Sequence, residues 1–466
     1  MTLSWNDPSR AARALPWLGM LLAAAAISLH SPGHVSMDTS VQLYEASLGK
    51  SVSWNPPFMS ALMRWLGGGE LATASLVFFS SVLIYLGLSA AAADSLQAGA
   101  GDRGRASGWL RLLLCGLVLL NPVIFLYVGI VWKDVLFASV TTAAASLALV
   151  AANAAPGRSF FLASVSVLLL AVSMQVRQQG VFMAPVLLLM PIIAFAGYRG
   201  WPPGRKRAAA LALAAIFVAT LFATKAMVGV TIVGAGDKSS SVGFRSIMSF
   251  DVAGTVARSD TPTASLPVAI TEQQRAAVRR VYSSLRVDYL LADPEASEWL
   301  RAMGDEQRKA AWLALARQET GAFLEHKWVT FRTVLGLNGV ESCLPIYIGV
   351  DGNSDYLRAA GVAAGRDGRD RAVYDMASYF DDWLIYRHWV YVSVLLAGMV
   401  ALAVVRLPAK TRLMAGVLAL ATGLFYLSFL PTAIACDFRY LFTGIPLVSL
   451  LAMVLVARGG HAEEMR

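Results

Sequence analysis

The stretch from Leu110 to Ala151 reads LRLLLCGLVLLNPVIFLYVGIVWKDVLFASVTTAAASLALVA, and it decides the fold class. It contains two apolar runs, with the pair Lys133 and Asp134 where they meet. Each run approaches the length of about 20 residues that a helix needs to cross a bilayer. Because almost no loop surrounds the pair, both charges are held at the membrane boundary, where ionisable groups are costly and usually functional.

Apolar runs of this kind recur along the chain and predict about ten membrane-spanning helices. The predicted spans are Leu15–Leu29, Leu71–Ala92, Leu110–Tyr127, Leu136–Ala151, Phe160–Met174, Val181–Ala196, Ala208–Val228, Trp389–Val405, Leu413–Leu430 and Leu441–Ala457. The composition agrees, since 57% of the residues are hydrophobic and only 15% are charged, unlike a soluble domain. We therefore expect an all-α polytopic membrane protein.

Basic residues predict the orientation of the spans. With the amino terminus placed in the cytoplasm, the short inner segments carry Arg10, Arg13, Arg103, Arg105, Arg158, Arg199, Arg205, Lys206, Arg207, Arg406, Lys410, Arg412, Arg458 and Arg466. Positively charged short loops stay in the cytoplasm, so both termini are expected there. The net charge of +9 is then explained by topology and anionic lipids, and no nucleic-acid partner is expected. The first run is expected to be a retained anchor, because no small-residue cleavage site follows it.

Two stretches interrupt the membrane pattern on the outer side. The first is the periplasmic loop of residues 31–70, in which we expect two helices at the membrane interface. Asp38 is predicted to cap the first helix, and Pro56 and Pro57 to precede the second, Phe58–Leu66.

The second stretch, residues 229–387, is predicted to be a mostly helical periplasmic domain. A capping box of Thr271 and Gln274 should start a helix that runs through Leu291, and an amphipathic helix should span Asp305–Leu337. The chain then divides into a membrane module of about seven helices, this domain, and about three further membrane helices. These parts would cover residues 1–228, 229–387 and 388–466.

Polar side chains from separate loops fall together on the outer side. They are Asp38, Trp54, Asn55, Lys133, Asp134, Arg177, Gln178, Arg439 and Tyr440. A carboxylate can take the proton of a hydroxyl group, while arginine binds phosphate through two parallel hydrogen bonds and stabilises a phosphate leaving group. We therefore predict Asp38 and Asp134 as catalytic and the other seven residues as substrate-binding. A polyprenyl-phosphate sugar, with its phosphate at the level of the lipid headgroups, fits this set.

The first outer loop, with Asp38 and then Trp54-Asn-Pro-Pro57, resembles the first loop of the GT-C superfamily of membrane glycosyltransferases. That superfamily includes protein O-mannosyltransferases and the aminoarabinose transferases of lipid A. The segments Trp132-Lys-Asp134, Arg177-Gln-Gln-Gly180 and Asp437-Phe-Arg-Tyr440 are similar to those of its bacterial relatives. The resemblance covers residues 1 to about 230 well and the last three spans loosely.

This resemblance implies transfer of a sugar, with inversion, from a polyprenyl-phosphate donor to a glycan or lipid acceptor of the cell envelope. The active site would face the periplasm from a bacterial inner membrane, with Asp38 as the single general base. Donor, acceptor and membrane lipids would be the partners. The chain departs from many relatives at Asn55, where they have a histidine before the proline pair.

Other function classes lack their motifs. The chain has no glycine-rich loop ending in Gly-Lys-Ser/Thr, no His-Glu-x-x-His sequence and no glycine-flanked nucleophilic serine, so no cofactor is expected. A divalent cation between Asp38 and Asp134 stays an alternative. The alternative function is a transporter or flippase of a lipid-linked glycan, in which Lys133 and Lys225 would line the route.

The three cysteines are too few for a disulfide framework. Cys343 and Cys436 both fall on the outer side, where a disulfide could persist, but we expect two free thiols because the sequence does not supply their Cα separation. Cys115 is expected to pack within a span as a small apolar residue.

Overall fold

The structure, a computed structural model, describes residues 11–99, 105–196, 202–234 and 239–459, and in these ranges it contains helices and no strand. Eight of the described helices are long and apolar enough to cross a membrane. They are Ala12–His30, Gly69–Ala98, Ser107–Tyr127, Lys133–Ala151, Pro156–Val176, Pro203–Thr231, Ala409–Thr432 and Phe438–Arg458. The chain is therefore an all-helical, multi-pass membrane protein, as predicted.

Two of the predicted spans are shorter than the others. One is Gly180–Phe195, which consists of α10 (Gly180–Leu187) and α11 (Leu189–Ala196), and the other is α21 (His388–Val404). Pro185 lies inside α10, where its ring removes a backbone donor and weakens the helix. All ten predicted apolar runs are thus helical, but only eight of the described helices have full spanning length.

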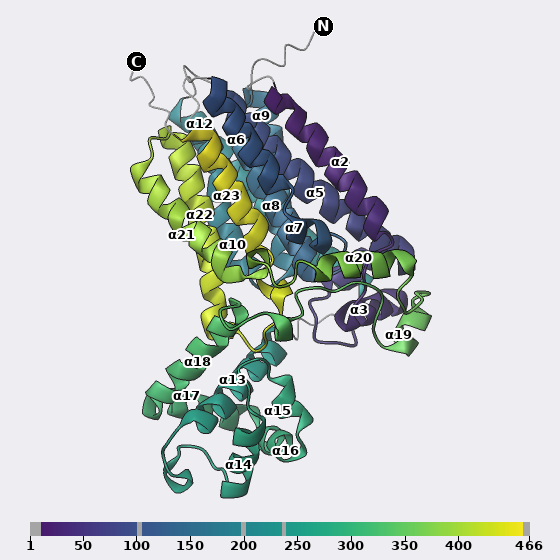
Figure 1. Ribbon diagram of the computed structural model, residues 1–466, viewed down its shortest axis with the longest axis vertical. Coiled ribbons are helices and arrows are strands. Elements are labelled where there is room, and N and C mark those ends of the chain that lie inside the picture. The colour runs from purple at the N-terminus through teal and green to yellow at the C-terminus, as the bar shows by residue number, and fades with distance from the viewer. Residues whose placement is uncertain (1–10, 100–104, 197–201, 235–238, 460–466) are drawn as a thin grey trace.

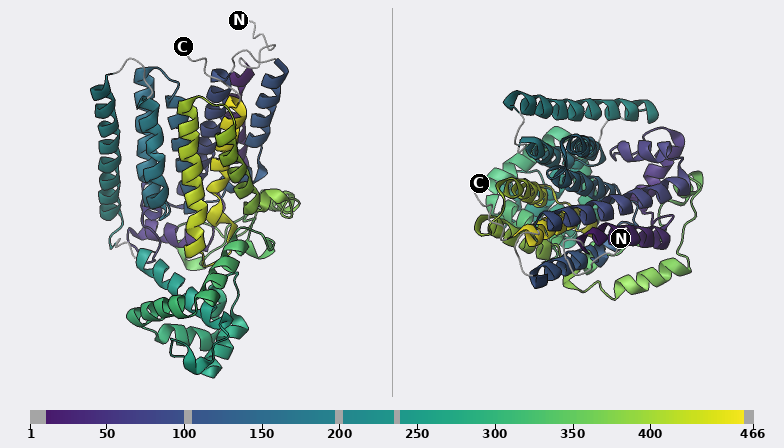
Figure 2. Two further views of the ribbon diagram at one scale, coloured as in Figure 1. Left: turned by 90° about the vertical axis from the view of Figure 1, so that its left-hand side faces the viewer. Right: turned by 90° about the horizontal axis from the view of Figure 1, so that it is seen from above.

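The bundle is built around α8 (Lys133–Ala151), which is buried along nearly its whole length. α8 packs against α5 (Gly69–Ala98) and α9 (Pro156–Val176), and its many small residues let the backbones approach closely. α12 (Pro203–Thr231) stands at the edge and is mostly exposed (Figure 2). The other bundle helices are α2 (Leu15–His30), α6 (Arg105–Leu119), α7 (Pro122–Tyr127), α22 (Ala409–Thr432) and α23 (Gly444–Arg458).

One end of the bundle carries the predicted basic residues, and there α2 begins and α23 ends (Figure 1). Lys410 donates hydrogen bonds to the carbonyl groups of Ala152 (2.8 Å) and Ala194 (2.7 Å), and Arg111 donates to that of Ala457 (3.2 Å). These cations satisfy carbonyl groups at helix C-termini and complement the helix dipoles. Four residues predicted for this end lie outside the described residues: Arg10, Arg103, Arg199 and Arg466.

The two helices predicted for the loop of residues 31–70 are present at the opposite end. They are α3 (Met37–Leu48) and α4 (Phe58–Trp65), and they pack against each other. The prediction that Asp38 caps α3 is wrong. Ser36 holds the extended N-cap position, and Asp38 lies in the first turn with its carboxylate turned to an arginine from another segment.

The chain between α12 and α21 forms two parts, which we call the lobe and the belt (Figure 1). The lobe projects from the bundle and has an apolar core of its own. Its helices are α13 (Ser239–Arg258), α14 (Glu272–Val281), α15 (Asp288–Ala292), α16 (Pro294–Ala302), α17 (Asp305–Gln318) and α18 (Thr320–Val334). The belt, residues 335–387, contains α19 (Ser354–Ala359) and α20 (Gly368–Ser378), and its apolar side chains join the core of the bundle.

The capping box at the start of α14 is present, with Thr271 and Gln274 bonded reciprocally. The helix ends at Val281 instead of Leu291, however. The reason is tertiary, because the next residues pair with the backbone just before α23: Val287 donates to Ile434 (2.9 Å) and Cys436 to Leu285 (2.5 Å). The lobe is thus tied to the segment that leads into the last span.

The predicted helix Asp305–Leu337 is two helices, α17 and α18. Glu319 leaves the helical conformation between them, and its carboxylate accepts hydrogen bonds from the hydroxyl groups of Ser259 (2.8 Å) and Thr261 (2.7 Å). The break lets both halves pack against α13, which a single straight helix would not do.

A buried carboxylate joins the lobe to the bundle. Asp251 on α13 is fully buried, lies 2.5 Å from the ammonium of Lys327 and 3.1 Å from Nε2 of His326, and accepts a hydrogen bond from Trp312 (2.8 Å). Lys327 also donates to the carbonyl of Pro431 (2.7 Å), near the C-terminus of α22, where helix carbonyl groups lack partners within the helix. The lysine therefore needs Asp251 as its counter-charge.

The Asp251→Ala variant should lose about 3–5 kcal/mol of unfolding free energy, because it leaves the buried Lys327 charge uncompensated. Chemical denaturation in detergent measures this loss. Asp355→Ala is the matched control, since Asp355 pairs with Arg358 at a site where both side chains are exposed and the pair contributes little. Equal stability of the two variants would contradict the role given to Asp251.

Candidate functional site

Six charged side chains meet at the end of the bundle from which the lobe projects. We call them the charged cluster: Asp38, Lys133, Asp134, Arg177, Asp437 and Arg439. They come from α3, the start of α8, the turn after α9 and the segment before α23. Five of the six were predicted from the sequence as site residues, and Asp437 was not.

Asp38 and Arg439 form the accessible ion pair of the cluster. Nη2 of Arg439 lies 2.7 Å from Oδ2 of Asp38, and the Asp38 side chain remains 40% exposed. Burial acts to raise the pKa of Asp38, but the nearby charges of Arg439 and Lys133 outweigh it and hold the pKa below its ordinary value. Asp38 is therefore an ionised carboxylate that a ligand can reach.

Arg439 is held in place from three sides. Its Nε donates to Asp437 Oδ2 (2.8 Å), and its guanidinium lies 4.7 Å from the ring centroid of Trp132. The Trp132 indole in turn donates to the hydroxyl of Ser36, the N-cap residue of α3 (2.7 Å). The start of α8, the start of α3 and the segment before α23 are thus connected through one guanidinium.

The segment that carries Asp437 and Arg439 is bonded to both the lobe and the belt. Besides the backbone pairing with the lobe, Cys436 forms a disulfide with Cys343 of the belt, with Cα atoms 4.8 Å apart. The prediction of two free thiols is therefore wrong. The two cysteines are 93 positions apart in the sequence, and only the fold brings them within bonding distance. Cys115 is buried and unbonded, as predicted.

Asp134 and Arg177 form a second, buried ion pair. Arg177 Nη1 contacts Asp134 Oδ1 and also donates to the carbonyl of Tyr440 (3.0 Å), and the guanidinium packs on the rings of Phe429 and Tyr440. The Asp134 side chain is only 1% exposed and that of Arg177 8%. Gln178, the next residue, is exposed. This pair holds the end of α9 against α8 and the segment before α23, and both of its charges are buried.

Lys133 lies at the open side of the cluster beside the first loop. Its ammonium donates to Asn55 Oδ1 (2.8 Å) and lies 5.6 Å from the ring centroid of Trp54, which is 46% exposed. Lys133 has no ion-pair partner within 4 Å in the described part of the chain. Its charge is therefore held in a fixed position by a neutral amide and remains available to an anion.

The sequence did not reveal what fixes Trp54 and Asn55. Glu45 on α3 is fully buried, and its carboxylate accepts hydrogen bonds from the backbone N–H groups of Val52 (2.8 Å) and Ser53 (2.7 Å) and from the Ser60 hydroxyl (2.7 Å). This carboxylate shapes the turn just before Trp54. Its burial could not be read from the sequence, because Glu45 looks like an ordinary charged position on an amphipathic helix.

The charged cluster does not resemble a metal site. No group of three or more His, Cys, Asp or Glu side chains suited to a metal occurs among the described residues. Asp38 and Asp134, the pair considered for a divalent cation, each face a different arginine. The residues present therefore do not form a coordination sphere.

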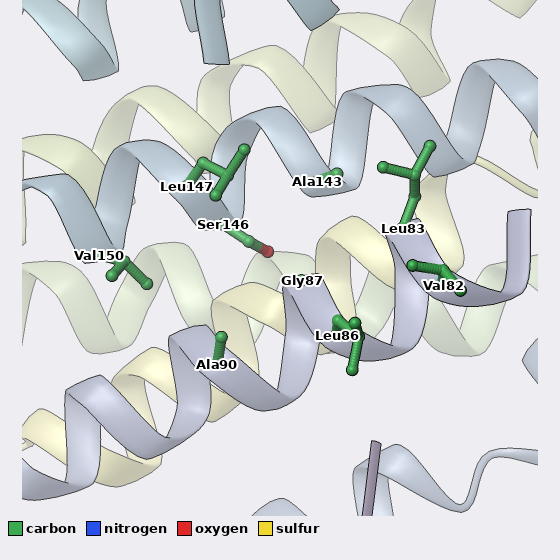
Figure 3. Close-up of a pocket in the computed structure, with 9 residues that line it drawn as sticks. All are labelled: Val82, Leu83, Leu86, Gly87, Ala90, Ala143, Ser146, Leu147 and Val150. Carbon is green, nitrogen blue, oxygen red and sulfur yellow. The ribbon is translucent and has the colours of Figure 1, made fainter. Parts of the chain in front are cut away.

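A separate hollow of about 300 Å³ lies between α5 and α8 (Figure 3). It is lined by Val82, Leu83, Leu86, Gly87, Ala90, Ala143, Ser146, Leu147 and Val150. The nearest of these on α8, Ala143, is about 15 Å along the helix from Lys133. The hollow is apolar and apart from the charged cluster.

Comparison of the chain with protein-family models, with curated proteins and with solved structures finds no match.

Asp134→Asn and Arg177→Gln should each lower the free energy of unfolding by about 3–5 kcal/mol, because each leaves one buried charge without its partner. The double variant should regain most of this stability, since no buried charge is left unpaired. Chemical denaturation of the three variants in detergent measures the effect. Stable single variants would show that the pair is not structural and would favour the predicted catalytic role of Asp134.

Proposed function

We propose that this protein is an integral membrane glycosyltransferase of the GT-C type, which moves a sugar from a polyprenyl-phosphate donor to an envelope glycan or lipid. One observation carries the proposal. The half-exposed carboxylate of Asp38 lies near the ammonium of Lys133, which has no ion-pair partner within 4 Å in the described part of the chain, at the end of a membrane bundle. Such a site offers a base and an anion-binding group at the depth of lipid headgroups.

We further propose that all ten apolar helices cross a bacterial inner membrane. At one end of the bundle, the helix ends and the short segments that join them carry Arg158, Arg205, Lys206, Arg207, Arg406, Lys410 and Arg412, and short basic segments stay in the cytoplasm. The charged cluster, the lobe and the belt would then face the periplasm, and both termini the cytoplasm.

In the proposed reaction, the hydroxyl oxygen of the acceptor attacks the anomeric carbon of the donor sugar. The bond from that carbon to the phosphate oxygen breaks, and polyprenyl phosphate leaves with the bonding electron pair. Asp38 accepts the hydroxyl proton as the new bond forms. Attack opposite the leaving phosphate inverts the anomeric centre. Arg439 acts as a positioning residue, because it holds the Asp38 carboxylate.

Lys133 is the group best placed to bind the donor phosphate. The sequence predicts Arg177 and Arg439 as substrate-binding residues too, but both guanidinium groups are already ion-paired. A phosphate at Lys133 would gain a charge-assisted hydrogen bond without breaking an existing ion pair. Trp54, exposed beside it, offers a ring face for the sugar.

The alternative of a transporter or flippase has less support. It requires charged groups along a route through the bundle, and Lys225, one of the two lysines assigned to that route, is exposed on the peripheral helix α12.

Purified protein in lipid nanodiscs, incubated with a panel of polyprenyl-phosphate sugars and envelope glycolipids, should release polyprenyl phosphate only when a suitable donor and acceptor are present. Sugar lipid moved across a vesicle membrane without release of polyprenyl phosphate would favour the flippase instead.

The Asp38→Asn variant should lower turnover by about 100-fold or more, since it keeps the size of the side chain but removes the base. Donor binding should persist, because Lys133 is unchanged. Asp355→Asn, a change of the same kind at an exposed acid of the belt, serves as the control. Near-normal turnover of Asp38→Asn would exclude Asp38 as the base.

The pH dependence of turnover follows from the direction in which the pKa of Asp38 is shifted. The pKa of Asp38 lies below the ordinary value of 3.8, so its carboxylate should stay ionised between about pH 8 and pH 5. Protonation of Asp38 should therefore not lower turnover in this range. In Arg439→Gln the largest opposing charge is lost, burial raises the pKa, and the acid limb of the rate profile should move to higher pH. An unmoved acid limb in that variant would contradict the assignment.

A further inference from the structure

The belt presents a second cation that the reaction as described does not use. Arg366 is exposed, yet its side chain is fixed. Its Nε donates to the carbonyl of Ile348 (2.8 Å), and its guanidinium stacks on Tyr374 with its centre 4.5 Å from the ring centroid. The backbone is shaped around it as well, because a Cβ on Gly349 would lie 2.5 Å from Arg366 Cγ. Gly349 also has a φ of +101°, which favours glycine.

The two Nη groups of Arg366 have no partner among the described residues, and no carboxylate lies within ion-pair distance of them. Two other arginines of the belt differ, since Arg358 pairs with Asp355 and Arg369 with Asp367. A guanidinium held rigid through one nitrogen, with two donors free, is suited to a planar or tetrahedral anion.

Arg366 belongs to a turn of the belt that is docked next to Asp38. Gly365 and Val350 exchange backbone hydrogen bonds of 2.9 Å, and the adjoining backbone pairs with Val35, three positions before Asp38. The hydroxyl of Tyr347 donates to the carbonyl of Val35 (3.0 Å).

A continuous set of contacts leads from there to the base. The Tyr347 ring packs on Trp132 with centroids 5.3 Å apart, and Trp132 carries the guanidinium of Arg439, which holds Asp38. These contacts connect the turn that carries Arg366 to the proposed site from the side of the belt. Lys133 lies on the side of the first loop, against Asn55.

We infer that Arg366 determines acceptor specificity by binding an anionic group of the acceptor, a phosphate or a carboxylate. The inference rests on the proposed function, in which Lys133 binds the donor. Asp38 is already paired with Arg439, so an acceptor anion needs a cation of its own, and Arg366 is a fixed cation with two free donor groups on the belt. Two cations at separate sides of the site would keep donor phosphate and acceptor anion apart.

The test measures binding and turnover of a glycolipid with one phosphate monoester, compared with the same glycolipid after phosphatase treatment. In nanodiscs of neutral lipid, Arg366→Gln should weaken binding of the phosphorylated form by about 10–150-fold and raise its KM similarly, with kcat little changed. Binding of the dephosphorylated form should not change. Arg366→Lys should fall between, because lysine keeps the charge but loses the two-donor geometry.

Arg371→Gln is the matched control. Arg371, on α20, is exposed like Arg366 and also donates one hydrogen bond through Nε, to the carbonyl of Asp367, but its guanidinium is not stacked on a ring of a described residue as that of Arg366 is. If Arg366 instead attracted bulk anionic lipid, both variants would show equal losses, and only in nanodiscs that contain phosphatidylglycerol. That result, or an Arg366→Gln variant that binds both glycolipids like the parent, would overturn the inference. Absence of any Asp38-dependent transfer would refute the proposed function instead, while the binding comparison would still decide the role of Arg366.

Discussion

The ion pair between Arg439 and Asp38 is the interaction on which the rest of the site depends. A guanidinium at the boundary of a membrane bundle is costly unless carboxylates neutralise it, and this one has two, Asp38 and Asp437. It also covers the Trp132 ring, whose indole bonds the N-cap residue of α3. Movement of α3 would separate Asp38 from Arg439, and movement of α8 would remove the Trp132 ring from the guanidinium. The pair therefore couples the first loop, α8 and the last span.

The lobe and the belt both bind the segment before α23 and restrain it. The lobe pairs its backbone with residues 434–436, and Lys327 bonds the carbonyl of Pro431 just before them. The belt adds the disulfide between Cys343 and Cys436. Each contact restrains a few residues that, without a helix, would be free to move. This explains why so much protein outside the bundle is attached to one short segment, and it gives the lobe a structural role whatever else it binds.

The charged cluster contains two kinds of charge, buried ones with a structural role and accessible ones. Asp134 and Arg177 neutralise each other in a buried pair that fixes helix ends, whereas Asp38 and Lys133 remain at the surface of the cluster. Both kinds look alike in a sequence, because each is an ionisable residue at the end of an apolar run. Burial decides between them, and burial depends on how the helices pack.

The sequence by itself determined the class of fold, the helical runs and the end of the bundle at which polar residues gather. These properties are local, since hydrophobic length and helix propensity act over neighbouring residues. Packing of the helices sets which charges pair, turns Asp38 toward Arg439 and away from the end of its own helix, and brings Cys343 to Cys436. Contacts with distant segments also end two predicted helices early, at Val281 and at Glu319. Such pairings depend on distances between helix ends, which arise from packing and have no local signal in the chain.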